Sequence, residues 1–82
     1  MIQRVLVANR GEIACRILRA CREAGLSSVA IYAENDREGM FRELAEASVL
    51  LAGDSITETY LNGAAIIQAA KDTGADAIHP GF

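Results

Sequence analysis

Four polar loops carry the residues of this chain whose types could bind a ligand or assist a reaction. Each loop follows a short apolar run typical of a strand, and ligands of open parallel sheets bind outside the carboxyl ends of the strands. The sequence therefore predicts a ligand-facing edge. Because the loops of any α/β domain are polar, the clustering alone does not distinguish a ligand-binding edge from ordinary surface loops. The four loops span 9–11, 34–37, 53–55 and 79–82.

The first of these loops can be compared with the dinucleotide-binding motif GxGxxG, whose glycines let the backbone approach a pyrophosphate. Only Gly11 is present: Asn9 and residues 13–14 occupy the positions where the motif would have its other glycines. Glu34 lies at about the distance of a ribose-binding acid. The presence of one glycine of three argues against NAD binding. Binding of an anion at the start of the helix, by backbone N–H groups and Arg10, remains a possibility. We favour the alternative in which Asn9 and Arg10 brace neighbouring loops.

Side chains with catalytic potential are few. His79 is the only histidine, and no Cys, Ser or acid lies at a spacing typical of a catalytic partner, so we expect it to shape its loop rather than act as a general base. No grouping of His, Cys and carboxylates predicts a metal site, and the sequence has no phosphate-binding glycine loop. Cys15 and Cys21 point in different directions on one predicted helix, so we expect two reduced core thiols of a cytosolic protein.

The element that positions the first loop is a strand followed directly by a helix. Val5–Ala8 is an apolar run typical of a strand buried on both faces, and the helix runs from near Glu12 to Gly25. Opposite charges four residues apart, in Glu12–Arg16 and Arg19–Glu23, favour the helix. Its apolar residues recur at three- and four-residue steps and predict the core-facing stripe: Ile13, Ile17, Ala20, Cys21 and Ala24.

The same alternation continues to the last residues. Strands are predicted at 28–32, 48–51 and 75–78, with a short helix over 40–45 that Asp36 could cap. A second long helix is predicted over 63–73, capped by Asn62 and ended by Gly74. The residues spaced along it are Ala64, Ile67, Ala70 and Lys71.

Alternating strands and helices predict an α/β fold, a Rossmann-like open parallel sheet with right-handed crossovers in a three-layer α/β/α arrangement. Eighty-two residues make one small domain. Because nothing in the sequence covers the edge beyond the last predicted strand, we expect a truncated fragment of a longer protein. The net charge of −3 argues against nucleic acid. No apolar run approaches the roughly 20 residues of a membrane span, and the first residues do not resemble a signal peptide.

Several segments together resemble one family. VLVANRGEIACRILRACREAG, SVAIYAENDRE, TYLN and GADAIHPGF are similar to the amino-terminal domain of biotin carboxylases, the pre-ATP-grasp domain, across residues 1–82. The resemblance implies that an ATP-grasp domain and a C-terminal domain of the parent lie outside this chain. It implies a ligase that uses ATP, Mg and bicarbonate to carboxylate biotin on a carrier protein, within an acyl-CoA, pyruvate or urea carboxylase.

The resemblance also implies partners, location and site residues. The parent is expected to be a homodimer that works with a biotin carboxyl carrier protein and a carboxyltransferase, in the cytoplasm or in the mitochondrial matrix of a eukaryote. It places Arg16, Arg19 and Glu23 at the dimer interface, and His79 and Phe82 at the rim of the biotin site. The fragment itself is expected to be inactive and to hold no cofactor, with no catalytic or metal-binding residue of its own.

Three positions depart from the family pattern. Phe82 stands where the family has a tyrosine, Phe41 where it has a histidine, and Glu46–Ala47 where it has Asp-Glu. The loss of the tyrosine hydroxyl leaves only ring contact at position 82. Two other readings stay open: a non-catalytic structural or dimerisation module, and a free-standing nucleotide-binding domain.

Overall fold

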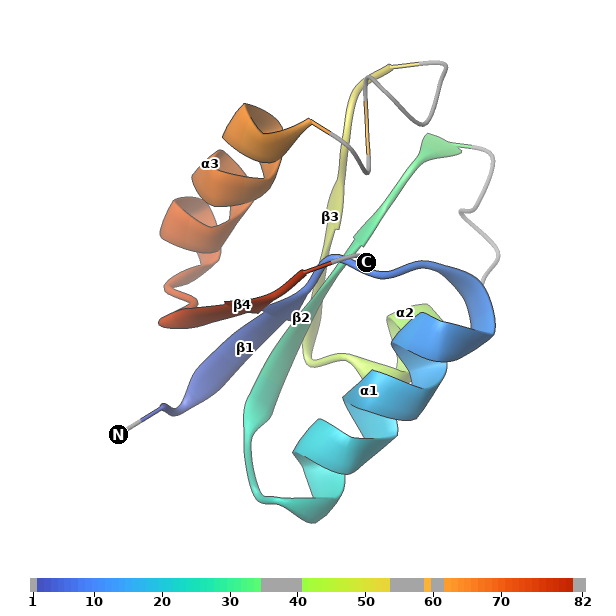
Figure 1. The fold of residues 1–82 in the computed structure, drawn as a ribbon, viewed down its shortest axis with the longest axis vertical. Helices are drawn as coiled ribbons and strands as arrows, with labels where there is room; N and C mark the ends of the chain where they lie inside the picture. The colour runs from blue at the N-terminus through green and yellow to red at the C-terminus, as the bar shows by residue number, and fades with distance from the viewer. Residues whose placement is uncertain (1, 35–40, 54–58, 60–61, 81–82) are drawn as a thin grey trace.

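A four-stranded parallel sheet forms the centre of the computed structural model, which describes residues 2–34, 41–53, 59 and 62–80 (Figure 1). The strands are β1 (Arg4–Val7), β2 (Ser27–Tyr32), β3 (Ala47–Leu50) and β4 (Ala77–His79), and the helices are α1 (Gly11–Glu23), α2 (Phe41–Leu44) and α3 (Gly63–Thr73). The strand order is β3-β2-β1-β4, and every pair is parallel. The predicted α/β class and parallel sheet are confirmed.

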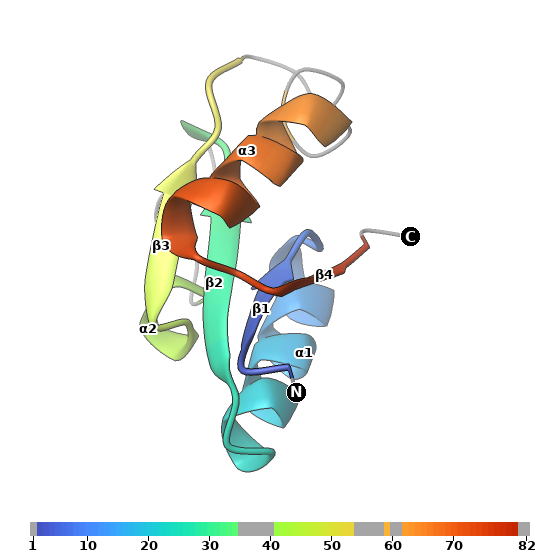
Figure 2. The same ribbon diagram turned by 90° about the vertical axis from the view of Figure 1, so that its left-hand side faces the viewer.

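Helices cover both faces of the sheet, as the three-layer prediction required (Figures 1 and 2). On one face α3 packs Ile66, Ala69 and Ala70 against alternate residues of β1 and β2, among them Leu6 and Ile31. On the other face α1 packs against the residues between them, with α2 beside it. This arrangement explains why the run Val5–Ala8 is apolar without alternation: its residues pack on both faces of the sheet.

The face of α1 that packs on the sheet differs from the predicted one. Ile13, Ala20 and Ala24 are exposed, and Ile17 is only partly buried. The buried residues are Ala14, Cys15, Leu18 and Cys21. The sequence contains two overlapping apolar stripes on this helix, and spacing alone does not choose between them. The helix begins at the turn from β1, where Gly11 adopts a left-handed φ of +63°, a backbone constraint that the spacing of apolar residues does not contain.

Helix ends agree with the predicted caps. Asn62 Oδ1 accepts from the N–H of Ala65 at 3.1 Å, and Gly74 ends α3 with a φ of +73°. Gly25 is also left-handed at +76°, and the N–H groups of Gly25 and Leu26 donate to the carbonyls of Arg22 and Cys21. This pattern of two bonds is the Schellman motif, which satisfies carbonyls at the end of α1.

Element boundaries moved most at the last strand, predicted over 75–78 and observed over Ala77–His79. Ala75 donates its N–H to Ala70 O and so completes the end of α3. Asp76 turns its carboxylate to the first residues of β1. On α3, Ala70 is the only buried residue of those that spacing singled out, since Ile67 and Lys71 are exposed and Ile66 and Ala69 are buried instead. The Asp36 cap lies outside the described residues.

The packing of α1 predicts unequal costs for two apolar substitutions on the same helix. Leu18 is 0% exposed and Ile13 is 58% exposed. Leu18→Ala should lower the free energy of unfolding by about 2–5 kcal/mol, because it leaves a cavity between α1 and the sheet. Ile13→Ala should change it by no more than about 0.5 kcal/mol. Urea unfolding of both variants checks this; a larger loss for Ile13→Ala would mean that the other stripe packs on the sheet.

Candidate functional site

The order of the strands reverses between β1 and β4. From β1 the chain proceeds outward through β2 to β3, and α3 then returns it to the other side of β1, where β4 forms. In open α/β sheets, ligands bind at the carboxyl ends of the strands where the order reverses. The residues that follow β1 and β4 therefore line the candidate functional site.

Asn9 and His79 meet at this switch point. The backbone N–H of Ala8 donates to His79 O at 3.0 Å, which extends the pairing of β1 with β4 by one residue. His79 Nδ1 lies 3.0 Å from Asn9 Oδ1 and 3.1 Å from the carbonyl oxygen of Pro80. Of the two residues predicted to brace neighbouring loops, Asn9 contacts the end of β4 through His79. The loop-shaping role of His79 stays a prediction, because residues 81–82 lie outside the described residues.

The start of α1 lies next to this contact. Arg10 is exposed and extended, and its side chain makes no capping hydrogen bond to the helix. Glu12 in the first turn has its carboxylate 3.9 Å from Arg16, with both side chains largely exposed. The acidic side chain already occupies the position that the helix dipole favours for an anion.

The remaining loops of the predicted edge are only partly described. Glu34 is exposed two residues after the end of β2, while residues 35–37, 54–55 and 81–82 lie outside the described residues. The predicted position of Phe82 at a biotin site therefore has no structural counterpart here.

A chain of polar contacts links the opposite, amino-terminal edge of the sheet. The Asp76 carboxylate, just before β4, accepts from the backbone N–H groups of Gln3 and Arg4 at 3.0 Å each. Arg4 Nε donates to Ser27 Oγ at 3.1 Å, and Ser27 Oγ donates to Glu46 Oε2 at 2.8 Å. The starts of all four strands are thus joined side by side.

Asp76 and Arg4 make the contacts that set the ionisation of this edge and connect it to α3. The N–H groups of Arg4 and Gln3 hold the pKa of the Asp76 carboxyl below its usual range, since they stabilise the ionised form. The Arg4 guanidinium also donates to the carbonyl of Thr73 in the last turn of α3. Arg4 thereby connects β1, β2 and α3.

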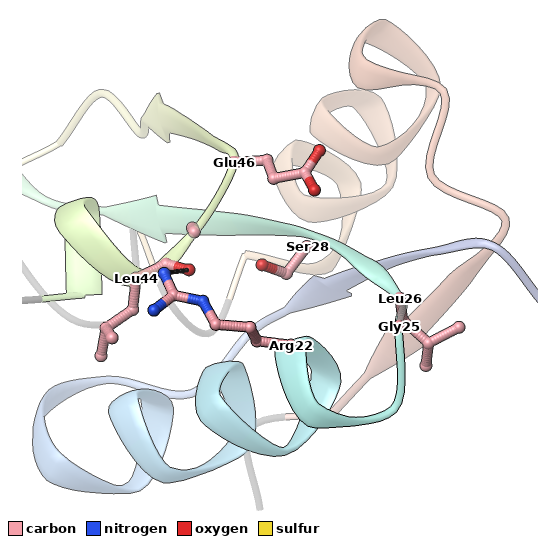
Figure 3. Close-up of a pocket in the computed structure, with 7 residues that line it drawn as sticks. Arg22, Gly25, Leu26, Ser28, Leu44 and Glu46 are labelled. Carbon is pink, nitrogen blue, oxygen red and sulfur yellow. Dashed lines mark hydrogen bonds between the residues drawn. The ribbon is translucent and has the colours of Figure 1, made fainter.

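A small pocket of about 240 Å³ opens at this same amino-terminal edge (Figure 3). Arg22 extends from the last turn of α1 and donates to the carbonyls of Leu44 at 3.1 Å and Glu43 at 3.5 Å. These are carbonyls at the end of α2, so the guanidinium acts as a cap for that short helix. The pocket lies away from the switch point, and its lining is Arg22, Gly25, Leu26, Ser28, Leu44, Ala45 and Glu46.

Both thiols lie in the core and are free. Cys15 and Cys21 are buried on the sheet-facing side of α1. Burial raises the pKa of the Cys21 thiol, which keeps it protonated and poorly nucleophilic. Within the described residues, no group of three His, Cys, Asp or Glu side chains could hold a metal ion. No helix in the same part of the chain is long and apolar enough to cross a bilayer.

Comparison with known proteins gives a single family. The model of the biotin carboxylase N-terminal domain matches residues 1–82. The chain belongs to this family. Biotin carboxylase from Pseudomonas aeruginosa is 54% identical over 82 residues, and the match covers 100% of this chain and 18% of that protein. The mitochondrial methylcrotonoyl-CoA carboxylase subunit alpha of Oryza sativa is 48% identical over 81 residues, covering 99% of this chain and 11% of that one.

Solved structures agree with the family in fold. The urea carboxylase of Kluyveromyces lactis superposes with a TM-score of 0.94 at 47% identity, covering 99% of this chain and 7% of that chain. The biotin carboxylase domain of the Hydrogenobacter thermophilus 2-oxoglutarate carboxylase gives 0.92 at 45% identity, covering 100% and 18%. That domain was solved as a dimer with MgADP, ADP and bicarbonate. The biotin carboxylase N-terminal domain thus occurs in urea, acyl-CoA and 2-oxoglutarate carboxylases.

The residues that the resemblance placed at a dimer interface lie together on α1. Arg16, Arg19 and Glu23 are all exposed, away from the sheet-facing side. Along α1, which is described throughout, Glu12 pairs with Arg16 and no ion pair joins Arg19 to Glu23. Of the two predicted charge pairs, one therefore forms.

Sequence reasoning missed the amino-edge contacts of Asp76, Arg4 and Arg22. One signal was available for the first two: an acid and an arginine placed at the starts of predicted strands, where backbone N–H groups and helix ends are close. The partner of Arg22 could not be found this way, because it is a backbone carbonyl in a helix of four residues.

The lowered pKa of Asp76 predicts a pH-dependent contribution to stability. The contribution is present above the unfolded-state pKa, about 3.9, and is lost as the pH falls through the lower folded-state pKa. Asp76→Asn should therefore be less stable than the natural chain at neutral pH, and the difference should shrink below about pH 4. Urea unfolding across this range measures it.

A matched control is Asp72→Asn, since Asp72 accepts from the Gln68 side chain at 2.8 Å on the exposed face of α3. It should show little change at either pH. A stability difference for Asp76→Asn that stays constant from neutral pH to pH 2, about two units below the usual carboxyl pKa, would contradict the assigned role.

Proposed function

We propose that this chain acts as the N-terminal domain of a longer biotin carboxylase, which uses ATP and bicarbonate to carboxylate biotin on a carrier protein. The observation that carries the proposal is the family match over residues 1–82 together with 54% identity to a biotin carboxylase along the whole chain. The chain spans 18% of that relative, so the other domains of such an enzyme would supply most of the reacting groups.

The described residues do not fit Mg-ATP. They hold no group of three metal-ligating side chains, and the turn after β1 carries one glycine rather than a phosphate-binding loop. No step through ATP, magnesium or bicarbonate is therefore assigned to this chain. In the proposed enzyme these groups are bound by the ATP-grasp domain. The Hydrogenobacter structure, a biotin carboxylase domain in complex with MgADP and bicarbonate, supports such binding within an enzyme of this family.

The contribution of this domain is positioning. The backbone pairing of Ala8 with His79 holds the end of β4 beside the turn after β1. Of the proposed rim of the biotin site, His79 is the last residue of β4, and Phe82 follows three positions later in the sequence. Phe82 has no hydroxyl, so it would contact the ureido ring through its aromatic face alone. The proposed enzyme works with a biotin carboxyl carrier protein and a carboxyltransferase. Its proposed location is the cytoplasm or the mitochondrial matrix, and the two free thiols in the core of this domain are consistent with such a reducing compartment.

A chimera tests the proposed function. The matching 82 residues of the Pseudomonas aeruginosa enzyme are replaced by this chain, and the carboxylation of free biotin with bicarbonate-dependent ATP cleavage is measured. We expect activity within about tenfold of the parent, equivalent to about 1.4 kcal/mol of transition-state stabilisation. The isolated 82-residue chain, as the control, should show none. A chimera that folds and binds ATP but does not carboxylate biotin would contradict the proposal.

The outer face of α1 is proposed as a homodimer contact. Exposed Ile13 and Ala20 lie beside the charged residues Arg16, Arg19 and Glu23 on α1, and protein interfaces combine apolar and charged side chains in this way. The dimer of the Hydrogenobacter biotin carboxylase domain supports homodimer formation, and the choice of this face rests on the exposed residues of α1 alone.

Reversing one charge tests the contact. Arg19→Glu in the chimera should weaken the dimer by about 100-fold or more, since like charges placed together across an interface cost several kcal/mol. Within the helix the cost is only about 0.2–0.5 kcal/mol, so the fold should persist. Lys71→Glu, an equal change of charge at an exposed position of α3, serves as the control. Sedimentation equilibrium that gives one dimer constant for all three proteins would refute the proposed interface.

A further inference from the structure

We propose that Asn9 is a positioning residue that fixes which ring nitrogen of His79 carries the proton, so that Nε2 faces a ligand as a hydrogen-bond acceptor. The tautomer is set by the geometry of this chain alone, whereas the identity of the ligand rests on the proposed function.

The tautomer follows from the two oxygens near Nδ1. Pro80 O lies 3.1 Å away and is a carbonyl, which can only accept. Nδ1 must therefore carry a hydrogen to make this contact. Asn9 Oδ1 at 3.0 Å accepts from the same N–H group. The neutral ring that satisfies both oxygens is the Nδ1–H form, which leaves its lone pair on Nε2.

The two acceptors differ in how firmly they are held. Pro80 follows His79 directly in the chain, so a hydrogen bond to its carbonyl does not connect the imidazole to another strand. Asn9 instead follows Ala8, which is buried and bonded through its N–H to His79 O at 3.0 Å. Val7 and His79 are also partners in the β1–β4 register. Asn9 thus connects the imidazole to the central strand of the sheet.

The placement gives Nε2 a defined chemical preference. Nε2 lies on the far side of the ring from Nδ1, and the His79 side chain is exposed at the carboxyl edge of β4. A lone pair there accepts from a neutral N–H or O–H donor and repels an anion. A ureido N–H group is such a donor. Asn9 would therefore favour a neutral ureido ring, such as that of biotin, over an anionic group at this point of the switch region.

The first experiment reads the tautomer directly. His79 is the only histidine of the chain, so the ring signals of the ¹⁵N-labelled protein need no assignment. Two-bond ¹H–¹⁵N spectra at a pH where the ring is neutral should show mainly the Nδ1–H form. Asn9→Ala should make Nε2–H the major form, and Asn9→Asp, which keeps an acceptor oxygen, should restore Nδ1–H. Gln68→Ala, at an exposed position of α3 far from His79 in the sequence, is the control.

The backbone amide spectrum of each variant reports whether the fold is kept, and the Asn9→Asp protein keeps the test decisive if Asn9→Ala does not fold. An Nε2–H major form in the natural chain, or the same tautomer in the natural and Asn9→Ala proteins, overturns the proposal. So does an Asn9→Asp protein in which Nε2–H is the major form.

The second experiment reads the consequence for the ligand. In the chimera, Asn9→Ala should raise KM for free biotin by about tenfold, the loss of one hydrogen bond, with kcat at saturating biotin little changed. Asn9→Asp should recover KM. A changed tautomer with an unchanged KM overturns the ligand assignment. If the unsubstituted chimera carboxylates no biotin, the proposed function fails, while the ring spectra still decide the role of Asn9.

Discussion

The burial of β1 on both faces and its pairing on both sides is the constraint on which the rest of this domain depends. Leu6 and Val7 are 0% and 1% exposed, one facing α3 and the other facing α1. A strand in this position must be apolar where both faces are buried and can carry polar residues only at or beyond its ends. Arg4, the first residue of β1, and Asn9, two residues after its end, accordingly lie at opposite edges of the sheet, and each connects β1 to a neighbouring strand.

The two edges serve different purposes because their contacts differ in kind. At the amino-terminal edge, Asp76, Arg4, Ser27 and Glu46 bond to one another or to backbone groups, and the result is a continuous connection across the starts of the strands. At the carboxyl edge the His79 ring uses one nitrogen for support and leaves the other available. The contacts at the amino-terminal edge hold the starts of the strands in register. At the carboxyl edge, an exposed imidazole is held against β1 by Asn9.

Much of the fold could be predicted because the relevant signals are local. Asn62 and Gly74 bound α3 through contacts within a few residues, and the uninterrupted apolar run of β1 indicates burial on both faces without any knowledge of its neighbours. The face of α1 could not be predicted in the same way. Leu18 and Ile13 both fit helical spacing, and which of them meets the sheet depends on how α1 is oriented against β1 and β2, which spacing does not record.

The candidate site was predictable in location and less so in detail. Strand order places the ends of β1 and β4 together, and the loop residues at 9–11 and 79–82 stood out by composition alone. The pairing of Asn9 with His79 depends on side-chain directions across 70 positions of sequence, which no periodicity records. The contacts of Asp76 were hidden for the same reason, since their partners are backbone N–H groups 72 and 73 positions away.

The long reach of the β1–β4 contacts also sets the order in which the domain can be completed during synthesis. During synthesis β1 leaves the ribosome before β2 and can pair with it once Ala30, the partner of Val7, has emerged. The pairing on the other side of Val7 requires His79, which emerges much later. In the interval β1 presents an open edge, and α3 is synthesised before that edge can close. Contacts of this span also make folding slower than the helical content alone suggests.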